Sequence, residues 1–332
     1  MRQPAIGAAL LATTSILAVG CAQIDDSQPV PDPGAGFQTL IEAVVSDNEA
    51  IHGAALAVMS PSRGLEWEGA AGLADPANGI EMTPANPVRI ASNTKTYTAA
   101  AVQRLAEDRL LDLDSPIEAH LPPEVAALLR SDGYDPSIIT IRHLLTHTGG
   151  LDDHGGADAF TEAIIADPRH HWTPVEQLTG LVEWGSKLGE PGEVYSYSDS
   201  GYVLLGLVIE KITGMKLGPA VRDLVSLGEL GLDSTWWELM EPAPEGVADR
   251  AHQFLGELDV YSHVPYFDLY GGGGIAATMG DLARFFGAIF RGGVYADPET
   301  VNVMLSTVDG VGPSPKATER SQPPGAYRMG LW

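Results

Sequence analysis

The chain is poor in cysteine and in basic residues. Cys21 is its only cysteine among 332 residues, so no internal disulfide can form and the core has to hold the fold. Lys and Arg number 19 against 44 Asp and Glu, a formal net charge of -25. Such acidity repels phosphates and argues against a nucleic-acid partner. With 38 glycines and 24 prolines the chain stays below the fraction typical of low-complexity sequence, and 44% hydrophobic residues can form a core.

The amino-terminal apolar stretch is shorter than a typical membrane span. It runs from Ala5 to Val19, follows Arg2 and precedes Cys21, which predicts an export signal over residues 1–20. Cys21 is well placed for lipid attachment, which would anchor the protein in the cell envelope at the outer face of a membrane. Ordinary cleavage and secretion is the alternative, because Ala18 stands where the lipidation pattern prefers leucine. Residues 21–36, with several prolines and acidic side chains, are expected to form a flexible tether.

Ser92 and Lys95 form a Ser-x-x-Lys pattern at the start of a helix-forming segment. From Thr94 to Arg109 the sequence is rich in alanine, which predicts a buried helix with Ser92 at its protected end. A spacing of three places the hydroxyl and the amine on one helical face. The amine can activate the serine if it is unprotonated, and the positive end of the helix dipole disfavours its charged form. Taken alone, the pattern equally fits a helix cap followed by an exposed lysine.

The surrounding sequence predicts an α+β fold in one globular unit over residues 37–332. Residues 37–90 are expected to carry a helix at 37–46 and a hairpin with strands at 53–60 and 65–69. Residues 91–300 are expected to be mainly helical, and residues 301–332 to return incompletely to the sheet. Helices are predicted from Thr140 to a stop at Gly149, over Val203–Thr213 and Leu217–Leu227, and over Asp281–Phe290 with Thr278 as its cap.

Further motifs follow Ser92 and Lys95 in a fixed order. They are Thr146-His147-Thr148-Gly149-Gly150-Leu151, Tyr197-Ser198-Asp199-Ser200-Gly201-Tyr202 and Gly273-Gly274-Ile275-Ala276-Ala277-Thr278. In this order they resemble the penicillin-recognising serine hydrolases, in the branch of class C β-lactamases, D-alanyl-D-alanine carboxypeptidases and related esterases. The resemblance implies a β-lactamase/transpeptidase-like fold, in which an antiparallel sheet with flanking helices is joined by a helical subdomain. It also implies no cofactor and no metal.

The resemblance assigns a role to each of three residues. Ser92 would be the acylated nucleophile, and Lys95 the partner that accepts or relays its proton. Tyr197 matches the tyrosine of the family's Tyr-x-Asn motif, which acts as general base or as the acid that protonates the leaving group. All three would be catalytic.

Asp199 stands where the family has asparagine, in a position assigned to substrate binding. A carboxylate accepts hydrogen bonds and donates none, so it can pair with Lys95 but cannot offer an N–H to a substrate carbonyl. Lys95 is then expected to be held more firmly in its charged form, and the identity of the base stays open. Ser198-Asp199-Ser200 can also be aligned with the Ser-Asp-Asn motif of class A enzymes, but the apolar run after Gly201 favours the tyrosine alignment.

The family's third element, Lys-Thr-Gly or His-x-Gly, is not found in its usual place. His147-Thr148-Gly149 matches its letters, but it lies between the first two motifs, where a helix end is the better interpretation. The true element is expected beyond Trp332. The chain is therefore expected to lack the C-terminal strands of the fold, as a fragment or as a shortened protein with impaired chemistry.

Two other patterns allow a chemical interpretation. His143 and His147, four apart and followed by Asp152, Asp153 and His154, could be drawn as a metal site, but no glutamate follows His143 as a zinc-protease motif requires. The glycine run 271–274 lacks the lysine and the strand-to-helix setting of a phosphate loop, so close backbone packing near the pocket is favoured. The resemblance assigns Gly273 and Gly274 to substrate binding.

The sequence thus predicts an exported serine hydrolase that forms an acyl-enzyme at Ser92. Its substrate would be a small molecule or peptide with an amide or ester bond, such as a β-lactam, a D-alanyl-D-alanine peptide or a small ester. A monomer is expected, with membrane contact only through a lipid anchor. The alternative is a catalytically impaired surface lipoprotein that binds cell-wall peptide or a protein partner, which Asp199 and the missing third element favour.

Overall fold

The computed structural model describes residues 33–262, 270–308, 310–316 and 327–331. The predicted export signal, Cys21 and most of the predicted tether lie outside these residues and stay predictions. The boundary of the tether is wrong, because helix α1, Pro33–Ser46, begins four residues before the predicted start at Phe37. Proline suits the first turn of a helix, since its missing N–H would have no intrahelical acceptor there.

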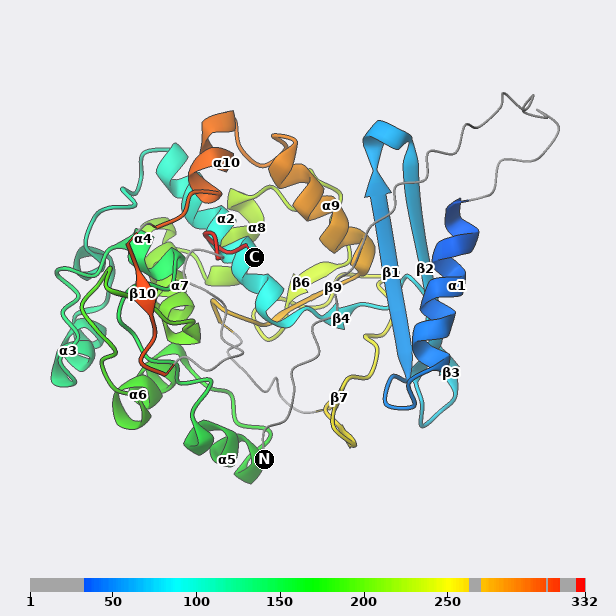
Figure 1. Ribbon diagram of the computed structural model, residues 1–332, viewed down its shortest axis with the longest axis horizontal. Coiled ribbons are helices and arrows are strands. Elements are labelled where there is room, and N and C mark those ends of the chain that lie inside the picture. The colour runs from blue at the N-terminus through cyan, green and yellow to red at the C-terminus, as the bar shows by residue number, and fades with distance from the viewer. Residues whose placement is uncertain (1–32, 263–269, 309, 317–326, 332) are drawn as a thin grey trace, which may run out of the picture.

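An antiparallel sheet follows α1 in the order β1-β2-β3, and its strands are β1 Gly53–Ser60, β2 Leu65–Asp75 and β3 Ile80–Glu81. The turn between β1 and β2 is a 3-10 helix, Pro61–Arg63, closed by Gly64 in the left-handed region. The β1 prediction is confirmed, whereas β2 is longer than expected because its small residues continue to pair with β1 and then with β3. Figure 1 shows α1 on one side of this sheet and α9, Met279–Phe290, on the other.

The helical part is built around α2, Thr94–Glu107. Every residue of α2 from Thr94 to Gln103 is buried, and Tyr97 stacks on Phe285 of α9 with ring centroids 3.7 Å apart. The predicted cap of α9 is present, since Thr278 Oγ1 accepts the N–H of Asp281 at 3.2 Å. The other helices are α3 Pro123–Ser131, α4 Ile141–Leu145, α5 Asp158–Ala166, α6 Pro174–Trp184, α7 Asp199–Thr213, α8 Leu217–Leu224 and α10 Pro298–Met304.

Short strands β5 to β9 lie in the part predicted to be mainly helical, and β4 and β10 lie just outside it. They form a second antiparallel sheet in the order β4-β9-β6 and two small pairs, with β10 parallel to β5 and β7 antiparallel to β8. Their bounds are β4 Val88–Arg89, β5 Val194–Tyr195, β6 Thr235–Trp237, β7 Phe254–Leu255, β8 Leu258–Asp259, β9 Ile275–Ala277 and β10 Gly312–Pro313. The fold is thus α+β, as expected.

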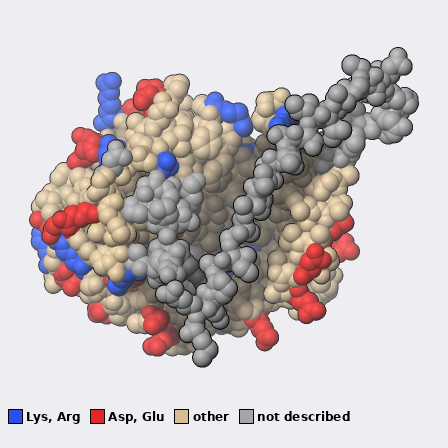
Figure 2. Space-filling model, viewed as in Figure 1, with Lys and Arg blue, Asp and Glu red and all other residues tan. Residues whose placement is uncertain are grey.

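The last described residues lie against α2 instead of the first sheet, which differs from the predicted return to it. Thr96 Oγ1 donates to the Gly330 carbonyl at 2.6 Å, and a side chain at Gly330 would meet Ala99 at 2.6 Å. Across the described ranges, no helix is both long and apolar enough to cross a membrane. Acidic and basic side chains are interspersed around the rim of the face in Figure 2.

Candidate active site

Ser92 lies on a strained turn directly before α2. It is the middle residue of the 3-10 helix Ala91–Asn93, and Ala91 has a positive φ of 48°. A left-handed conformation costs a residue other than glycine about 1 kcal/mol. The contacts of the surrounding structure therefore compensate for the backbone strain at Ala91. The helix is buried as predicted, but Ser92 itself is exposed. The expectation of a protected end is wrong for the serine, whose hydroxyl is accessible to a substrate.

Two side chains from different elements contact the Ser92 hydroxyl. Tyr197 OH donates to Ser92 Oγ at 2.8 Å, and Lys95 Nζ lies 3.3 Å from the same oxygen. Tyr197 is placed by the start of α7, where Ser198 Oγ accepts the N–H of Gly201 at 3.3 Å. The structure therefore brings the three residues that the sequence singled out to one point.

The Lys95 amine contacts hydrogen-bond acceptors from three segments of the chain. Its side chain is 2% exposed and forms an ion pair with Asp199 at the start of α7. Lys95 Nζ also donates to the Gly272 carbonyl at 2.9 Å, in addition to its contact with Ser92. Three acceptors match the three N–H bonds of an ammonium group. The predicted pairing of Asp199 with Lys95 is present, and it favours the charged lysine.

Two opposing effects act on the pKa of the Tyr197 phenol. Burial raises the pKa of Tyr197, and the positive charge of Lys95 opposes this rise. The ring of His147 packs against Tyr197 with centroids 4.5 Å apart. Burial, reinforced by the charge of Lys95, lowers the pKa of His147 well below its usual value, so the imidazole is neutral. Its Nδ1 accepts the N–H of Ser198 at 3.2 Å, which fixes the loop that carries the tyrosine.

A pocket of about 420 Å³ opens beside the Ser92 hydroxyl. Its apolar wall is formed by Phe286, Phe290 and Leu305, and its lining includes two cations, Lys95 and Arg328. No carboxylate is among its described lining residues. Neutral or anionic groups should therefore enter this pocket more easily than cations.

The glycine run reaches the site through its backbone. Gly273 and Gly274 are buried and do not line the 420 Å³ pocket, so the structure does not place them against a substrate. Gly272 instead supplies the carbonyl that accepts from Lys95, and the Gly271 carbonyl accepts from Thr98 Oγ1 at 2.7 Å. The expected close backbone packing is confirmed.

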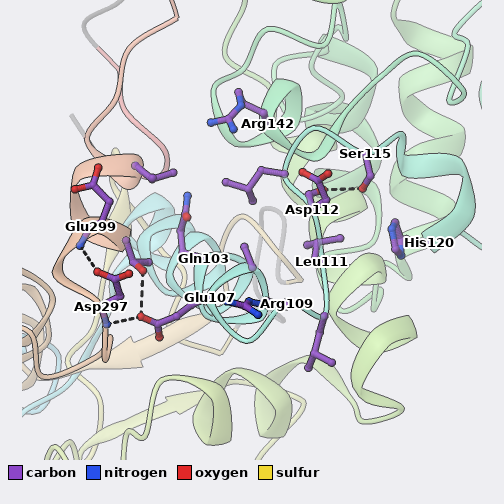
Figure 3. A pocket seen from close by; sticks show the side chains of 15 residues that line it. Gln103, Glu107, Arg109, Leu111, Asp112, Ser115, His120, Arg142, Asp297 and Glu299 are labelled. Atoms are coloured by element: carbon purple, nitrogen blue, oxygen red, sulfur yellow. Dashed lines mark hydrogen bonds between the residues drawn. The ribbon is translucent and has the colours of Figure 1, made fainter.

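A larger pocket of about 640 Å³ lies at the other end of α2. Figure 3 shows its polar side chains in separate groups, with Glu107 facing Asp297 before the start of α10 and Ser115 beside Asp112. Glu107 accepts the N–H of Asp297 at 2.7 Å, and Ser115, the serine of this pocket, donates to the Asp112 carbonyl at 2.6 Å. Because this serine is bound to a backbone carbonyl, we place the chemistry in the smaller pocket.

The histidines considered as metal ligands are occupied by other partners. His143 Nδ1 accepts the N–H of Thr140 at 3.1 Å, and His154 Nδ1 lies 2.8 Å from Ser200 Oγ. Within the described residues, no three His, Cys, Asp or Glu side chains are grouped so that they could hold a metal ion.

Sequence reasoning missed three kinds of residue near Ser92. Asp153, which contacts Asp199, was noted only as a possible metal ligand. His147 was considered as a metal ligand and as part of a helix end, but its packing against Tyr197 was not foreseen. The apolar wall and Arg328 carry no local signal, because they come from α9, the end of α10 and the last described segment.

A serine contacted by a lysine amine and a tyrosine phenol, on an α+β scaffold, is an arrangement typical of serine hydrolases. The comparison with known families gives the particular group. The family model described as Beta-lactamase matches residues 37–322, so the chain belongs to the beta-lactamase family. This family groups penicillin-binding proteins, esterases and D-amino acid amidases.

Curated relatives match parts of the chain. Penicillin-binding protein 4* of Bacillus subtilis (strain 168) is 29% identical over 232 residues, which are 64% of this chain and 48% of the relative. Esterase EstB of Burkholderia gladioli is 34% identical over 177 residues, 52% of this chain and 44% of the relative. The matched part of the chain thus spans less than half the length of each relative.

Solved structures match over a larger share of the chain. The D-stereospecific amidohydrolase from a Streptomyces species has a TM-score of 0.67 at 28% identity, over 84% of this chain and 78% of that one. The D-amino acid amidase from Ochrobactrum anthropi SV3 has a TM-score of 0.69 at 25% identity, over 82% of this chain and 74% of that one. Both share the fold described above.

Proposed function

We propose that this chain is a serine hydrolase that forms an acyl-enzyme on Ser92 from an ester or amide substrate. The observation that carries the proposal is the contact of one exposed hydroxyl with both Tyr197 OH and Lys95 Nζ, at 2.8 and 3.3 Å. The alternative of an impaired binding protein is not favoured, because such a protein has no need of this arrangement at the mouth of a pocket.

The reaction follows from where the proton can go. Ser92 Oγ attacks the substrate carbonyl carbon, and its proton has to pass to a group within hydrogen-bond reach. As an ammonium group Lys95 has no lone pair, so Tyr197 in its phenolate form is the base. The phenolate is the minor form, because burial raises the pKa of Tyr197, but the nearby ammonium stabilises it. The same proton then passes from Tyr197 to the departing alcohol or amine. Water releases the acyl group in a second round, which restores Ser92.

The pocket supports a neutral or anionic substrate with an apolar acyl group. Phe286, Phe290 and Leu305 offer apolar surface beside Ser92, and two cations lie in the lining. The names of the relatives add an esterase, a penicillin-binding protein and a D-amino acid amidase. A β-lactam, a D-alanyl-D-alanine peptide and a small ester all remain within this class.

The proposal is tested by the mass of the intact protein after exposure to an activated ester, p-nitrophenyl acetate, and separately to a penicillin. We expect a single adduct of the corresponding acyl mass with at least one of them. Ser92→Ala should form no adduct with either, because the nucleophile is gone. An adduct that is unchanged by Ser92→Ala, or a folded wild-type protein without any adduct, would refute the proposal.

A neighbouring pair of glycines tests whether the Lys95–Asp199 contact matters. A methyl group on Gly155 would lie 2.7 Å from Asp199 Oδ2, closer than side chains tolerate. Gly155→Ala should therefore displace Asp199 from Lys95 and lower the acylation rate by about tenfold. Gly156→Ala is the matched control, because its nearest neighbour would be Asp153 Oδ2 at an ordinary 3.5 Å. Equal acylation rates in the two variants would show that the contact is dispensable.

A further inference from the structure

Asp153 is a carboxyl group that no recognised motif contains. It lies in the segment after α4 and accepts the N–H of Asp199 at 2.9 Å and the N–H of Gly155 at 3.2 Å, both through Oδ1. Asp199 is the first residue of α7, so Asp153 binds the backbone of the residue whose side chain pairs with Lys95. Through this bond Asp153 helps to set the position of Asp199.

The two carboxyl groups converge beside one glycine. A methyl group built on Gly155 would lie 2.7 Å from Asp199 Oδ2 and 3.5 Å from Asp153 Oδ1. Lys95 is the cation that faces them. The adjacent Asp152 is balanced by Lys316 at 2.5 Å. Burial lowers the pKa of His154, the other ionisable neighbour, to about 4, so its ring is neutral.

One cation facing two carboxyl groups favours a proton on one of them. Burial, followed by the negative charge of Asp199, raises the pKa of Asp153 to about 7. The backbone N–H bonds and Lys95 oppose this rise without cancelling it. As the pH rises through about 7, Asp153 loses its proton and the site gains a second negative charge beside Lys95.

We propose that Asp153 is a positioning residue that makes the reactivity of Ser92 depend on its own protonation. In both of its forms Asp153 accepts the N–H of Asp199 and so helps to hold Asp199 beside Lys95. In its ionised form it adds a second negative charge beside Lys95, which offsets the positive charge that stabilises the Tyr197 phenolate and so disfavours that phenolate. The inference rests on the proposed function, and it concerns the pH dependence of acylation instead of its existence.

Asp153→Asn separates the charge of this residue from its structural role. The amide oxygen can accept the same two backbone N–H groups, so the variant resembles the neutral form at every pH. The acylation rate with p-nitrophenyl acetate is measured from pH 5.5 to 8.5, with Ser92→Ala as the blank. We expect the ratio of variant rate to wild-type rate to rise from about one at pH 5.5 to about tenfold at pH 8.5.

Asp152→Asn is the matched control, because its charge is already balanced by Lys316. Its ratio to the wild type should be the same at all pH values. A constant ratio for Asp153→Asn, or an equal rise in both variants, would overturn the assignment to Asp153. A wild-type protein without acylation dependent on Ser92 would instead contradict the proposed function, which distinguishes the two failures.

Stability provides a readout that needs no substrate and no catalysis. Folded Asp153 keeps its proton to a higher pH than the unfolded chain does, where its pKa is about 4. Its contribution to stability is thus complete below that value and is lost as the pH rises through about 7. The melting temperature of Asp153→Asn relative to the wild type should rise over this range, and a constant difference would contradict the proposal.

If the variant does not fold, infrared titration of the wild type must show a buried carboxylic acid that ionises near pH 7, and its absence overturns the proposal.

Discussion

Lys95→Met is expected to lower the rate of Ser92 acylation by about a thousandfold or more. The variant keeps an unbranched apolar chain of similar length in a site where the lysine side chain is 2% exposed. It removes the ammonium group that contacts Ser92 and stabilises the Tyr197 phenolate. Rapid-mixing measurement of acylation with p-nitrophenyl acetate gives the rate directly.

The same variant should destabilise the fold, because Asp199 loses its counter-charge. Removing one partner of a buried ion pair costs about 3 kcal/mol, and less here because the Asp199 side chain is 16% exposed to solvent. The double variant Lys95→Met/Asp199→Asn removes both charges, so urea unfolding should show part of the stability restored while acylation stays absent. Wild-type acylation in Lys95→Met would show that the lysine is only structural.

The local parts of the site could be predicted because they depend on short spacings. Ser92 and Lys95 are three residues apart, and a helix of that composition places both side chains on one face. The pairing of Lys95 with Asp199 follows from charge once both are assigned to one site. Tyr197 is different, because only the resemblance to a family connected it with a serine 105 residues away.

The parts that could not be predicted depend on contacts between distant segments. Asp153 and Asp199 are 46 residues apart, and no period or motif indicates that their carboxyl groups converge on Gly155. The sheet β4-β9-β6 is made of strands of two or three residues, too short for an alternating pattern to be recognised. In both cases contacts between distant segments determine the arrangement. Helices α2, α7 and α9, which the sequence did predict, form part of the core that brings those segments together.

Gly271→Ala is expected to be the most destabilising small change in the glycine run. An added methyl group would lie 2.6 Å from the backbone carbon of Tyr202 and closer still to its carbonyl oxygen. Tyr202 is fully buried in α7, so neither segment can move aside without disturbing the core. We expect a loss of about 3 kcal/mol or more in the free energy of unfolding, measured in urea.

The same change should impair the site in the protein that remains folded. The Gly271 carbonyl accepts a hydrogen bond from Thr98 Oγ1 at 2.7 Å, and the Gly272 carbonyl accepts one from Lys95 Nζ at 2.9 Å. Both bonds tie the glycine run to α2. Moving this backbone away from α7 shifts the acceptor that holds the lysine, so acylation falls along with stability. Gly228→Ala is the control, because nothing lies within 4 Å of its added methyl group and its φ is not positive. That variant should be as stable as the wild type or slightly more so. If Gly271→Ala unfolded at the same urea concentration as Gly228→Ala, the close approach of this backbone to α7 would be wrong.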